Sequence, residues 1–237
     1  MIDPVPLAPG VPSASGVPLA SGVPLASGRE ADVFPYADGR VLRRYRNGAG
    51  TAGEAMMMRY AATHGFPVPE VFEARGPDLI MERLEGPTLA AAFITGAVPI
   101  AEAATMLASL HHRLHAVPPP FHPEPGMALL HLDLHPENVM LTARGPVVID
   151  WHNAAEGPPD LDPAVTAMIL AEVAADRTHP HTSAAAAFLP LFLTAIGGTP
   201  LAELPRAVEI RRIDPTLTPT EHAHITAAAT FLRSTPT

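Results

Sequence analysis

The chain has 237 residues, of which 47% are hydrophobic and 16% charged, so it can bury a sizeable core in one or two small domains. Its formal net charge of −9 argues against a nucleic-acid partner, and the lack of cysteine excludes disulfides and thiolate metal sites. It lacks the basic start of a signal peptide and any uninterrupted apolar run of roughly 18 residues, so we expect a globular cytoplasmic protein without a membrane partner.

The first residues form a tandem repeat. Residues 5–28 read as four hexads, VPLAPG, VPSASG, VPLASG and VPLASG. A Pro at the same place in every repeat argues against a parallel β-helix, because each Pro lacks the N–H that a ladder needs. The composition instead predicts a partly extended tail over residues 1–24, disordered through about residue 22.

Strand patterns follow the tail. Residues 27–34 and 41–45 flank an Asp-Gly turn at residues 38 and 39, which predicts a hairpin. Residues 51–64 have helical composition, and Glu54 stands three residues after Thr51, as in a capping box. Residues 66–72 and 79–86 predict two more strands and a short linker. The arginines at positions 40, 43, 44 and 46 are also compatible with a solvated basic edge strand.

Helical patterns dominate the second half. Helices are predicted from residue 89 to 94 and, with a clear 3.6-residue apolar stripe, from 100 to 115. His111, His112 and His115 have a spacing that metal sites use, but with no carboxylate beside them we interpret them as a helix flank packed near a loop. Further helices are predicted at residues 164–174, 182–196, 201–211 and 219–233, with Asp160 and Asp162 as N-capping residues.

Between these helices lies the stretch with the most chemistry, HLDLHPENVMLTARGPVVIDW, from His131 to Trp151. Two short apolar runs separated by a turn at residues 144–146 predict a hairpin, which brings its ends together. Asp133, Asn138 and Asp150 can therefore share one site. Phosphoryl transfer needs such a set, because one Asp orients or accepts the proton of a hydroxyl while Asn and a second Asp bind magnesium.

The wording HxDxHPxN, followed by a hydrophobic strand and IDW, resembles the aminoglycoside phosphotransferase and choline kinase-like family of the kinase superfamily. The resemblance covers about residues 27 to 180. It implies an α+β, two-lobed protein-kinase-like fold, with a small antiparallel-sheet nucleotide-binding lobe at residues 25–85 and a mainly helical catalytic lobe at residues 86–237. The implied activity is transfer of the γ-phosphoryl group of ATP to a hydroxyl of a small molecule, with Mg²⁺.

The resemblance also implies roles for single residues. Asp133 would be the catalytic base or orienting group, and Asn138 and Asp150 would bind the metal. In a Lys-free chain, Arg43 would contact the α- and β-phosphates and pair with Glu54. The residues implied in cofactor binding are Ser27, Gly28, Arg43, Glu54, Glu82 and Leu84, the first two in a phosphate-covering loop and the last two near the adenine.

Two departures from the family pattern keep alternatives open. Arg43 replaces a lysine, and Leu132 stands where the family usually has Gly, which leaves a weakened enzyme or a ligand-binding pseudokinase possible. A zinc-dependent hydrolase is a third interpretation, because His131, Asp133 and His135 alternate on one face of an extended segment. Six acids and no Arg between residues 145 and 176 would favour a cationic acceptor: Asp150, Glu156, Asp160, Asp162, Glu172 and Asp176.

Overall fold

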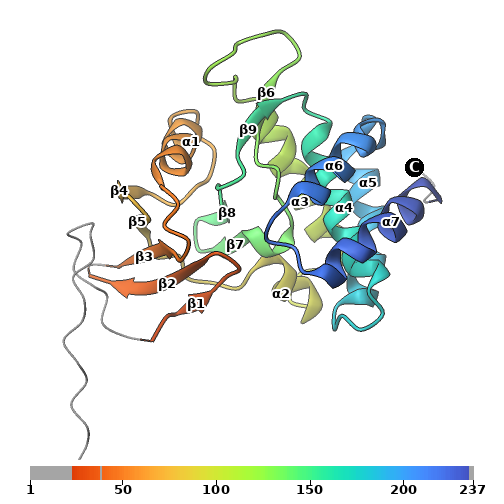
Figure 1. Ribbon diagram of the computed structural model, residues 1–237, viewed down its shortest axis with the longest axis horizontal. Coiled ribbons are helices and arrows are strands. Elements are labelled where there is room, and N and C mark those ends of the chain that lie inside the picture. The colour runs from red at the N-terminus through yellow and green to blue at the C-terminus, as the bar shows by residue number, and fades with distance from the viewer. Residues whose placement is uncertain (1–22, 38, 235–237) are drawn as a thin grey trace, which may run out of the picture. The chain divides into compact units, whose positions relative to one another are not determined.

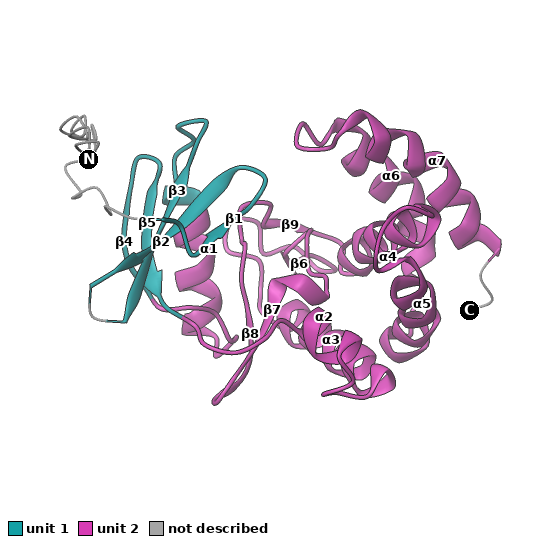
Figure 2. Ribbon diagram, turned by 90° about the horizontal axis from the view of Figure 1, so that it is seen from below, with its two compact units in different colours: residues 1–53, 71–83 teal, residues 54–70, 84–237 magenta. Residues whose placement is uncertain are grey.

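A computed structural model describes residues 23–37 and 39–234 (Figure 1). The repeats up to residue 22, for which disorder is predicted, and the turn residue Asp38 lie outside the described residues. The chain divides into two compact units (Figure 2): unit 1 contains residues 1–53 and 71–83, and unit 2 contains residues 54–70 and 84–237.

Unit 1 is built on a five-stranded antiparallel sheet with the strand order β1-β2-β3-β5-β4. The strands are β1 (Ala26–Ser27), β2 (Ala31–Tyr36), β3 (Arg40–Tyr45), β4 (Val71–Arg75) and β5 (Asp78–Glu82). The predicted first hairpin is confirmed, with Ala31 opposite Tyr45 and Tyr36 opposite Arg40. The strand predicted at residues 66–72 begins only at Val71, since the two prolines at 67 and 69 cannot donate to a ladder.

The strand β3 lies in the middle of this sheet, between β2 and β5. The interpretation of its arginines as a solvated edge strand is therefore wrong. Leu42 is fully buried against Ile80, and Phe34 and Tyr36 pack on the same cluster. Arg44 makes a two-pronged ion pair with the buried Asp78, with Nε–Oδ1 and Nη2–Oδ2 distances of 2.5 and 2.7 Å. Arg44 thus belongs to the structure of the sheet.

Unit 2 is mainly helical. Its helices are α1 (Ala52–Thr63, from Glu54 onward), α2 (Leu89–Ile94), α3 (Ile100–His115), α4 (Leu161–Ala175), α5 (Thr182–Ile196), α6 (Leu204–Ile213) and α7 (Pro219–Ser234). Helix α4 is buried on every side and packs against α5, α6 and α7, while α3 packs against α5. The small antiparallel sheet of unit 1 and the helices of unit 2 confirm the predicted α+β, two-lobed fold.

Two pairs of short strands complete unit 2. The strands β7 (Val139–Thr142) and β8 (Gly145–Val148) form the predicted hairpin, although Gly145 and Pro146 belong to β8 and the turn lies at residues 143 and 144. The strands β6 (Ala128–Leu130) and β9 (Ala155–Gly157) pair across the catalytic stretch and were not predicted. Short 3₁₀ turns occupy Pro136–Asn138 and Pro200–Glu203, the second in place of the expected first turn of α6.

The segment that enters unit 2 after β5 is fixed to the β7–β8 hairpin. Leu141 N–H donates to the Pro87 carbonyl at 2.9 Å, and Thr88 pairs with Met140 in an isolated bridge. Gly86 has a φ of 136°, and a Cβ added there would overlap the Leu141 carbonyl oxygen. Only glycine fits this position without a shift of the backbone.

Within the described residues, no single helix has the length and apolar character to span a membrane, although the bent pair Thr182–Ile196 and Pro200–Ile213 passes that test together.

Candidate active site

The first residue of the catalytic stretch, His131, braces the stretch from inside. It follows β6 directly and is fully buried, and its Nε2 lies 3.1 Å from the Ile149 carbonyl oxygen, to which it donates. Its ring meets the Trp151 ring edge-on at 4.9 Å, and Trp151 Nε1 donates to the Val148 carbonyl at 3.0 Å. His131 and Trp151 therefore tie the start of the stretch to its end.

The loop after His131 holds Asp133 and Asn138 together. The Asn138 Nδ2 group donates to the Asp133 backbone carbonyl at 2.9 Å and to Asp133 Oδ2 at 3.0 Å. Ile149 N–H in turn donates to the Asn138 carbonyl at 3.0 Å, which places the neighbouring Asp150 beside the loop. The structure thus brings together the three residues that the hairpin argument grouped, all within unit 2.

The electrostatics of Asp133 reflect this crowding. Burial raises the pKa of the Asp133 carboxyl, and the negative charge of Asp150 raises it further, while His135, His131 and Arg211 oppose the rise. His135 Nε2 lies 3.6 Å from Asp133 Oδ1. A carboxylate with a raised pKa is a better proton acceptor than an ordinary aspartate, as a base for a hydroxyl requires.

The backbone of the loop is held by a residue that the sequence analysis assigned to another role. Asp162 Oδ2 accepts the N–H of His131 at 3.1 Å and Asp162 Oδ1 accepts the N–H of Leu132 at 2.7 Å. The interpretation of Asp162 as an N-cap is wrong, because α4 begins at Leu161 and Asp162 already lies inside the helix. The Asp162 side chain accepts hydrogen bonds from the loop instead. The signal in the sequence was an acid near the start of a largely apolar helix, because a buried carboxylate must find partners.

Two residues of the site have left-handed backbones. Leu132 has a φ of 59° and Asp150 a φ of 66°. Asp tolerates this region, but for Leu it costs energy because the Cβ approaches the following carbonyl oxygen. The Gly usual at this place in the family would carry no such cost, which gives the departure at Leu132 a physical meaning.

In unit 1, Ser27 and Gly28 lie at the tight turn between β1 and β2. Gly28 N–H donates to the Ala31 carbonyl at 2.9 Å, and Ser27 pairs with Asp32 in the ladder. Arg46 secures the turn, since its guanidinium donates to the Gly28 carbonyl at 2.7 Å and forms an ion pair with Asp32. Sequence reasoning did not assign Arg46 this role.

Arg43 is buried in the middle of β3, 8% exposed, and its guanidinium carbon lies 4.9 Å from the centre of the Tyr45 ring. Glu54 is buried in α1 and belongs to unit 2, whereas Arg43 belongs to unit 1. The expected pairing of Arg43 with Glu54 therefore stays a prediction. Glu82 ends β5 in unit 1, and Leu84 is half-buried at the start of the next segment of unit 2. The roles of these residues toward a nucleotide remain predictions.

The three residues of the hydrolase interpretation do not form a ligand set. His131 directs Nε2 to the Ile149 carbonyl, and Asp133 Oδ2 accepts a hydrogen bond from Asn138 Nδ2. Among the residues that the structure describes, a group of His and acidic side chains suited to one cation occurs elsewhere, at His111, His115 and Asp162. The geometry therefore gives no support to zinc at His131, Asp133 and His135.

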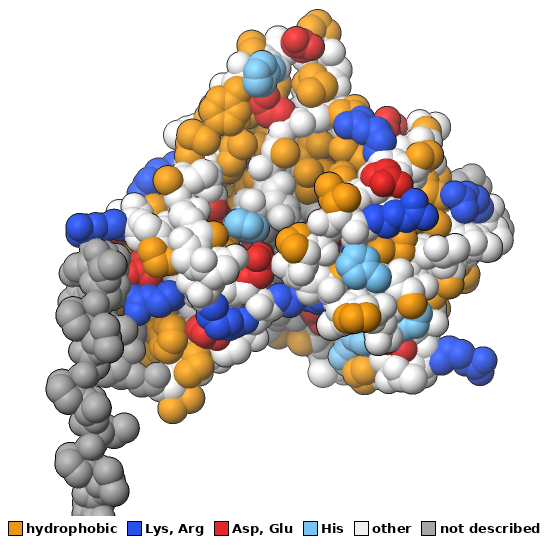
Figure 3. Space-filling model, in the orientation of Figure 1, with side chains coloured by type: hydrophobic (Ala, Val, Ile, Leu, Met, Phe, Trp, Pro, Cys, Tyr) orange, Lys and Arg blue, Asp and Glu red, His pale blue; other side chains and the backbone are white. Residues whose placement is uncertain are grey.

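Most of the six acids expected to attract a cation have partners. Glu156 binds the backbone N–H groups of Phe121 and His122, and Asp162 holds the catalytic loop. Glu172 forms a two-pronged ion pair with the half-buried Arg211, at 3.1 and 2.9 Å. Figure 3 likewise shows Arg and acidic side chains side by side on the face drawn. The excess of acids near the site is thus smaller than the sequence count suggests.

The comparisons with known proteins concern the family and the fold. The model of the phosphotransferase enzyme family matches residues 21–128 and 125–196, which is more than half of the chain. The chain belongs to this family. A search of curated proteins gave no significant match.

Solved structures of this phosphotransferase fold resemble the chain at low sequence identity. A thermostable mutant of aminoglycoside phosphotransferase APH(4)-Ia is 16% identical with a TM-score of 0.58, covering 90% of this chain and 95% of that one. A choline/ethanolamine kinase family protein from Mesorhizobium loti is 18% identical with a TM-score of 0.55, covering 92% and 90%. A streptomycin-ATP complex of APH(2″)-IIa is 14% identical with a TM-score of 0.53, covering 80% and 84%. These likenesses show a common fold, and the family is one of small-molecule phosphotransferases.

Proposed function

We propose that this phosphotransferase family member transfers the γ-phosphoryl group of ATP to a hydroxyl of a small molecule. The observation that carries the proposal is the arrangement of Asp133, Asn138 and Asp150 on one braced loop and hairpin of unit 2. Support comes from a related fold, APH(2″)-IIa, which was solved with ATP and streptomycin. The class of acceptor follows from the family, and its identity is left to experiment.

In this proposal Asp133 orients the acceptor hydroxyl and receives its proton as the phosphoryl group arrives. The hydrogen bonds from Asn138 Nδ2 fix the Asp133 carboxylate, so that one oxygen keeps a constant direction. The raised pKa of Asp133 matches the task, because the carboxylate must hold a proton briefly and then release it.

Asn138 and Asp150 fit a magnesium ion by the chemistry of their donor atoms. The side-chain hydrogen bonds of Asn138 to other described residues all use Nδ2, which leaves the amide oxygen for a cation. Asp150 provides a carboxylate, and Mg²⁺ prefers hard oxygen ligands of this kind. When bound with ATP, the ion would neutralise charge on the phosphates during transfer.

For unit 1, we propose that Arg43 contacts the phosphates in place of the family's lysine and that Glu54 positions it. Ser27 and Gly28 would cover the phosphates with backbone N–H groups, and Glu82 and Leu84 would lie near the adenine. What supports Arg43 is its burial on a central strand, because a guanidinium held in place there can bind a phosphate with two parallel hydrogen bonds.

The test compares wild type with Asp150→Ala and Asp133→Asn by thermal unfolding with and without Mg²⁺ and ATP. At about a hundred times the Kd, a ligand adds roughly 2.7 kcal/mol of stability, which is a rise in Tm of several degrees. We expect this rise in wild type and Asp133→Asn, and its loss in Asp150→Ala. Asp160→Ala, on a neighbouring acid outside the site, is the matched control and should keep the rise.

A screen of hydroxyl acceptors with ATP then tests transfer itself. Asp133→Asn should lose at least about 100-fold in kcat while still binding Mg²⁺ and ATP. If wild type binds nucleotide but phosphorylates no acceptor, the result supports the interpretation as a ligand-binding pseudokinase. If wild type shows no shift at millimolar nucleotide, the proposed ATP dependence is wrong.

A further inference from the structure

A second cluster of ligand-type side chains lies behind the catalytic loop, apart from the Asp133 site. His111 and His115 stand four residues apart on α3, so both side chains lie on the same face of that helix. Across from them, α4 presents Asp162. The sequence shows no carboxylate beside these histidines, and they were therefore interpreted as a packed helix flank. In the structure, Asp162 supplies that carboxylate.

The distances suit a small metal ion. His115 Nε2 and His111 Nδ1 lie 3.1 and 3.5 Å from the same oxygen, Asp162 Oδ2, and the three ligand atoms all lie within 4.8 Å of one another. Zinc binds such atoms at about 2.0–2.2 Å, so neighbouring ligand atoms of a tetrahedral centre are roughly 3.3–3.6 Å apart. Two of the three separations are already close to that range.

The contacts of Thr166 bear on which nitrogen of His111 carries the proton. Thr166 Oγ1 has one proton and donates it to the Leu134 carbonyl at 2.8 Å. With the Thr166 proton directed to Leu134, Nε2 is the donor in the 3.2 Å contact between Thr166 Oγ1 and His111 Nε2. In a neutral ring, His111 Nδ1 therefore carries only a lone pair.

That lone pair faces a carboxylate in a buried place. His111 is fully buried, its Nδ1 makes no hydrogen bond within the described part of the chain, and the nearest charged atom is Asp162 Oδ2 at 3.5 Å. In this tautomer two acceptors face each other, and a cation between them would remove their repulsion.

We propose that His111, His115 and Asp162 bind a divalent transition metal of the zinc class, which fixes the catalytic loop through Asp162. The surrounding contacts match those of known sites, where ligating His and carboxylate groups are themselves hydrogen-bonded. Thr166 accepts from His111 Nε2, and the N–H groups of His131 and Leu132 donate to the Asp162 carboxylate. The ligand types, two imidazoles and one carboxylate, favour zinc over magnesium or calcium.

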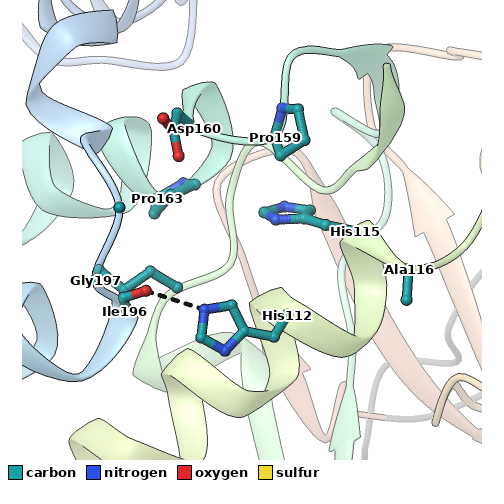
Figure 4. Close-up of a pocket in the computed structure, with 9 residues that line it drawn as sticks. His112, His115, Ala116, Pro159, Asp160, Pro163, Ile196 and Gly197 are labelled. Carbon is teal, nitrogen blue, oxygen red and sulfur yellow. Dashed lines mark hydrogen bonds between the residues drawn. The ribbon is translucent and has the colours of Figure 1, made fainter. Parts of the chain in front are cut away.

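One ligand of the proposed site, His115, borders a cavity. His115 lines a cavity of about 430 Å³ between the end of α3, the start of α4 and the Gly197-Gly198 turn (Figure 4). In this view the ring of His115 points toward the segment with Pro159 and Pro163, whereas His112 points to the Ile196 carbonyl, with which it bonds at 3.0 Å. A water from this cavity could complete the coordination at the fourth position.

The experiment uses the full chain, stripped of metal with a chelator and then titrated with Zn²⁺. We expect one equivalent to bind, and a rise in Tm of about 5–10 °C at a hundred times the Kd. Cobalt(II), added in place of zinc, should give the intense visible absorption of a tetrahedral centre. His111→Gln and His115→Gln should each remove binding, while His112→Gln, on the same helix, and Asp150→Ala, in the Asp133 site, should keep it.

The outcome does not depend on phosphotransfer. A Kd of about 1 µM would make about 100 µM free zinc a hundredfold excess over the Kd. If wild type binds no zinc at that concentration, the proposal is overturned without any variant. Binding that survives His111→Gln, or that is lost in Asp150→Ala, would place the ion elsewhere and overturn it as well. Circular dichroism of the metal-free variants shows whether each one is folded, and a variant that unfolds is replaced by His111→Asn or His115→Asn.

Discussion

Leu132 carries a backbone conformation that suits glycine, and its cost can be measured. A left-handed backbone costs a residue with a Cβ roughly 1–2 kcal/mol, and glycine avoids this cost. Glycine also makes the unfolded chain more flexible, which cancels part of the gain in stability. We predict that Leu132→Gly raises the free energy of unfolding by about 0.5–1 kcal/mol. Leu132→Ala is the control, because it removes the side chain but keeps the Cβ. If the glycine variant is no more stable than the alanine variant in denaturant unfolding, the strain is absent.

The raised pKa of Asp133 predicts how stability changes with pH. Because its pKa is higher in the folded than in the unfolded chain, folding stability falls as pH rises from the unfolded value of about 3.9 through the folded value. Asp133→Asn removes this loss. The variant should therefore exceed wild type in Tm by more at pH 7 than at pH 4, and an equal difference at both values would contradict a raised pKa.

At the scale of elements, α4 holds the catalytic loop through one side chain. Asp162→Ala would leave the buried N–H of His131 and the half-buried N–H of Leu132 without acceptors, at about 1–3 kcal/mol each. We predict a loss of roughly 2–5 kcal/mol in the free energy of unfolding. Asp160→Ala, two residues earlier, removes a bond from the exposed Thr199 hydroxyl and should cost less than about 1 kcal/mol. Equal losses in the two variants would show that the anchoring role is wrong.

The junction between the entering segment and β7 makes a second element-scale prediction. Gly86→Ala would place a Cβ against the Leu141 carbonyl oxygen, in addition to the strain of a positive φ. Gly96→Ala meets the strain alone, since nothing lies within 4 Å of its added Cβ. We expect Gly96→Ala to lose about 1 kcal/mol and Gly86→Ala at least about twice that. Urea unfolding of both variants side by side measures the difference.

At the scale of the whole molecule, the two units do not follow the order of the chain. Residues 54–70, with most of α1, group with unit 2, although unit 1 flanks them on both sides. A fragment of residues 23–83 would separate α1, with its buried apolar side chains Ala55, Met57, Met58 and Ala61, from the rest of the unit with which it groups. We predict that this fragment binds a hydrophobic dye and aggregates. A monomeric fragment without dye binding would show that it folds alone.

Sequence reasoning located most of the elements because their signals are local. The apolar stripe of α3 gave both ends of that helix, and α2 and α5 also match their predicted ranges. The strands β6 and β9 were missed, since each has three residues and pairs with a partner far along the chain, which no local pattern reveals. Asp133, Asn138 and Asp150 could be grouped because one hairpin joins them. Asp162 could not, because only tertiary packing brings α4 to the loop.

The dependence of the catalytic loop on Asp162 has a consequence for synthesis. The ribosome releases Asp133 well before Asp162, and β6 likewise lacks its partner β9 until that segment has emerged. The loop cannot take its final shape while the nascent chain ends short of α4. An arrested or cleaved product that stops between β9 and α4 would carry every proposed phosphotransfer residue and still lack a formed site, so a truncated gene product should be inert rather than weakly active.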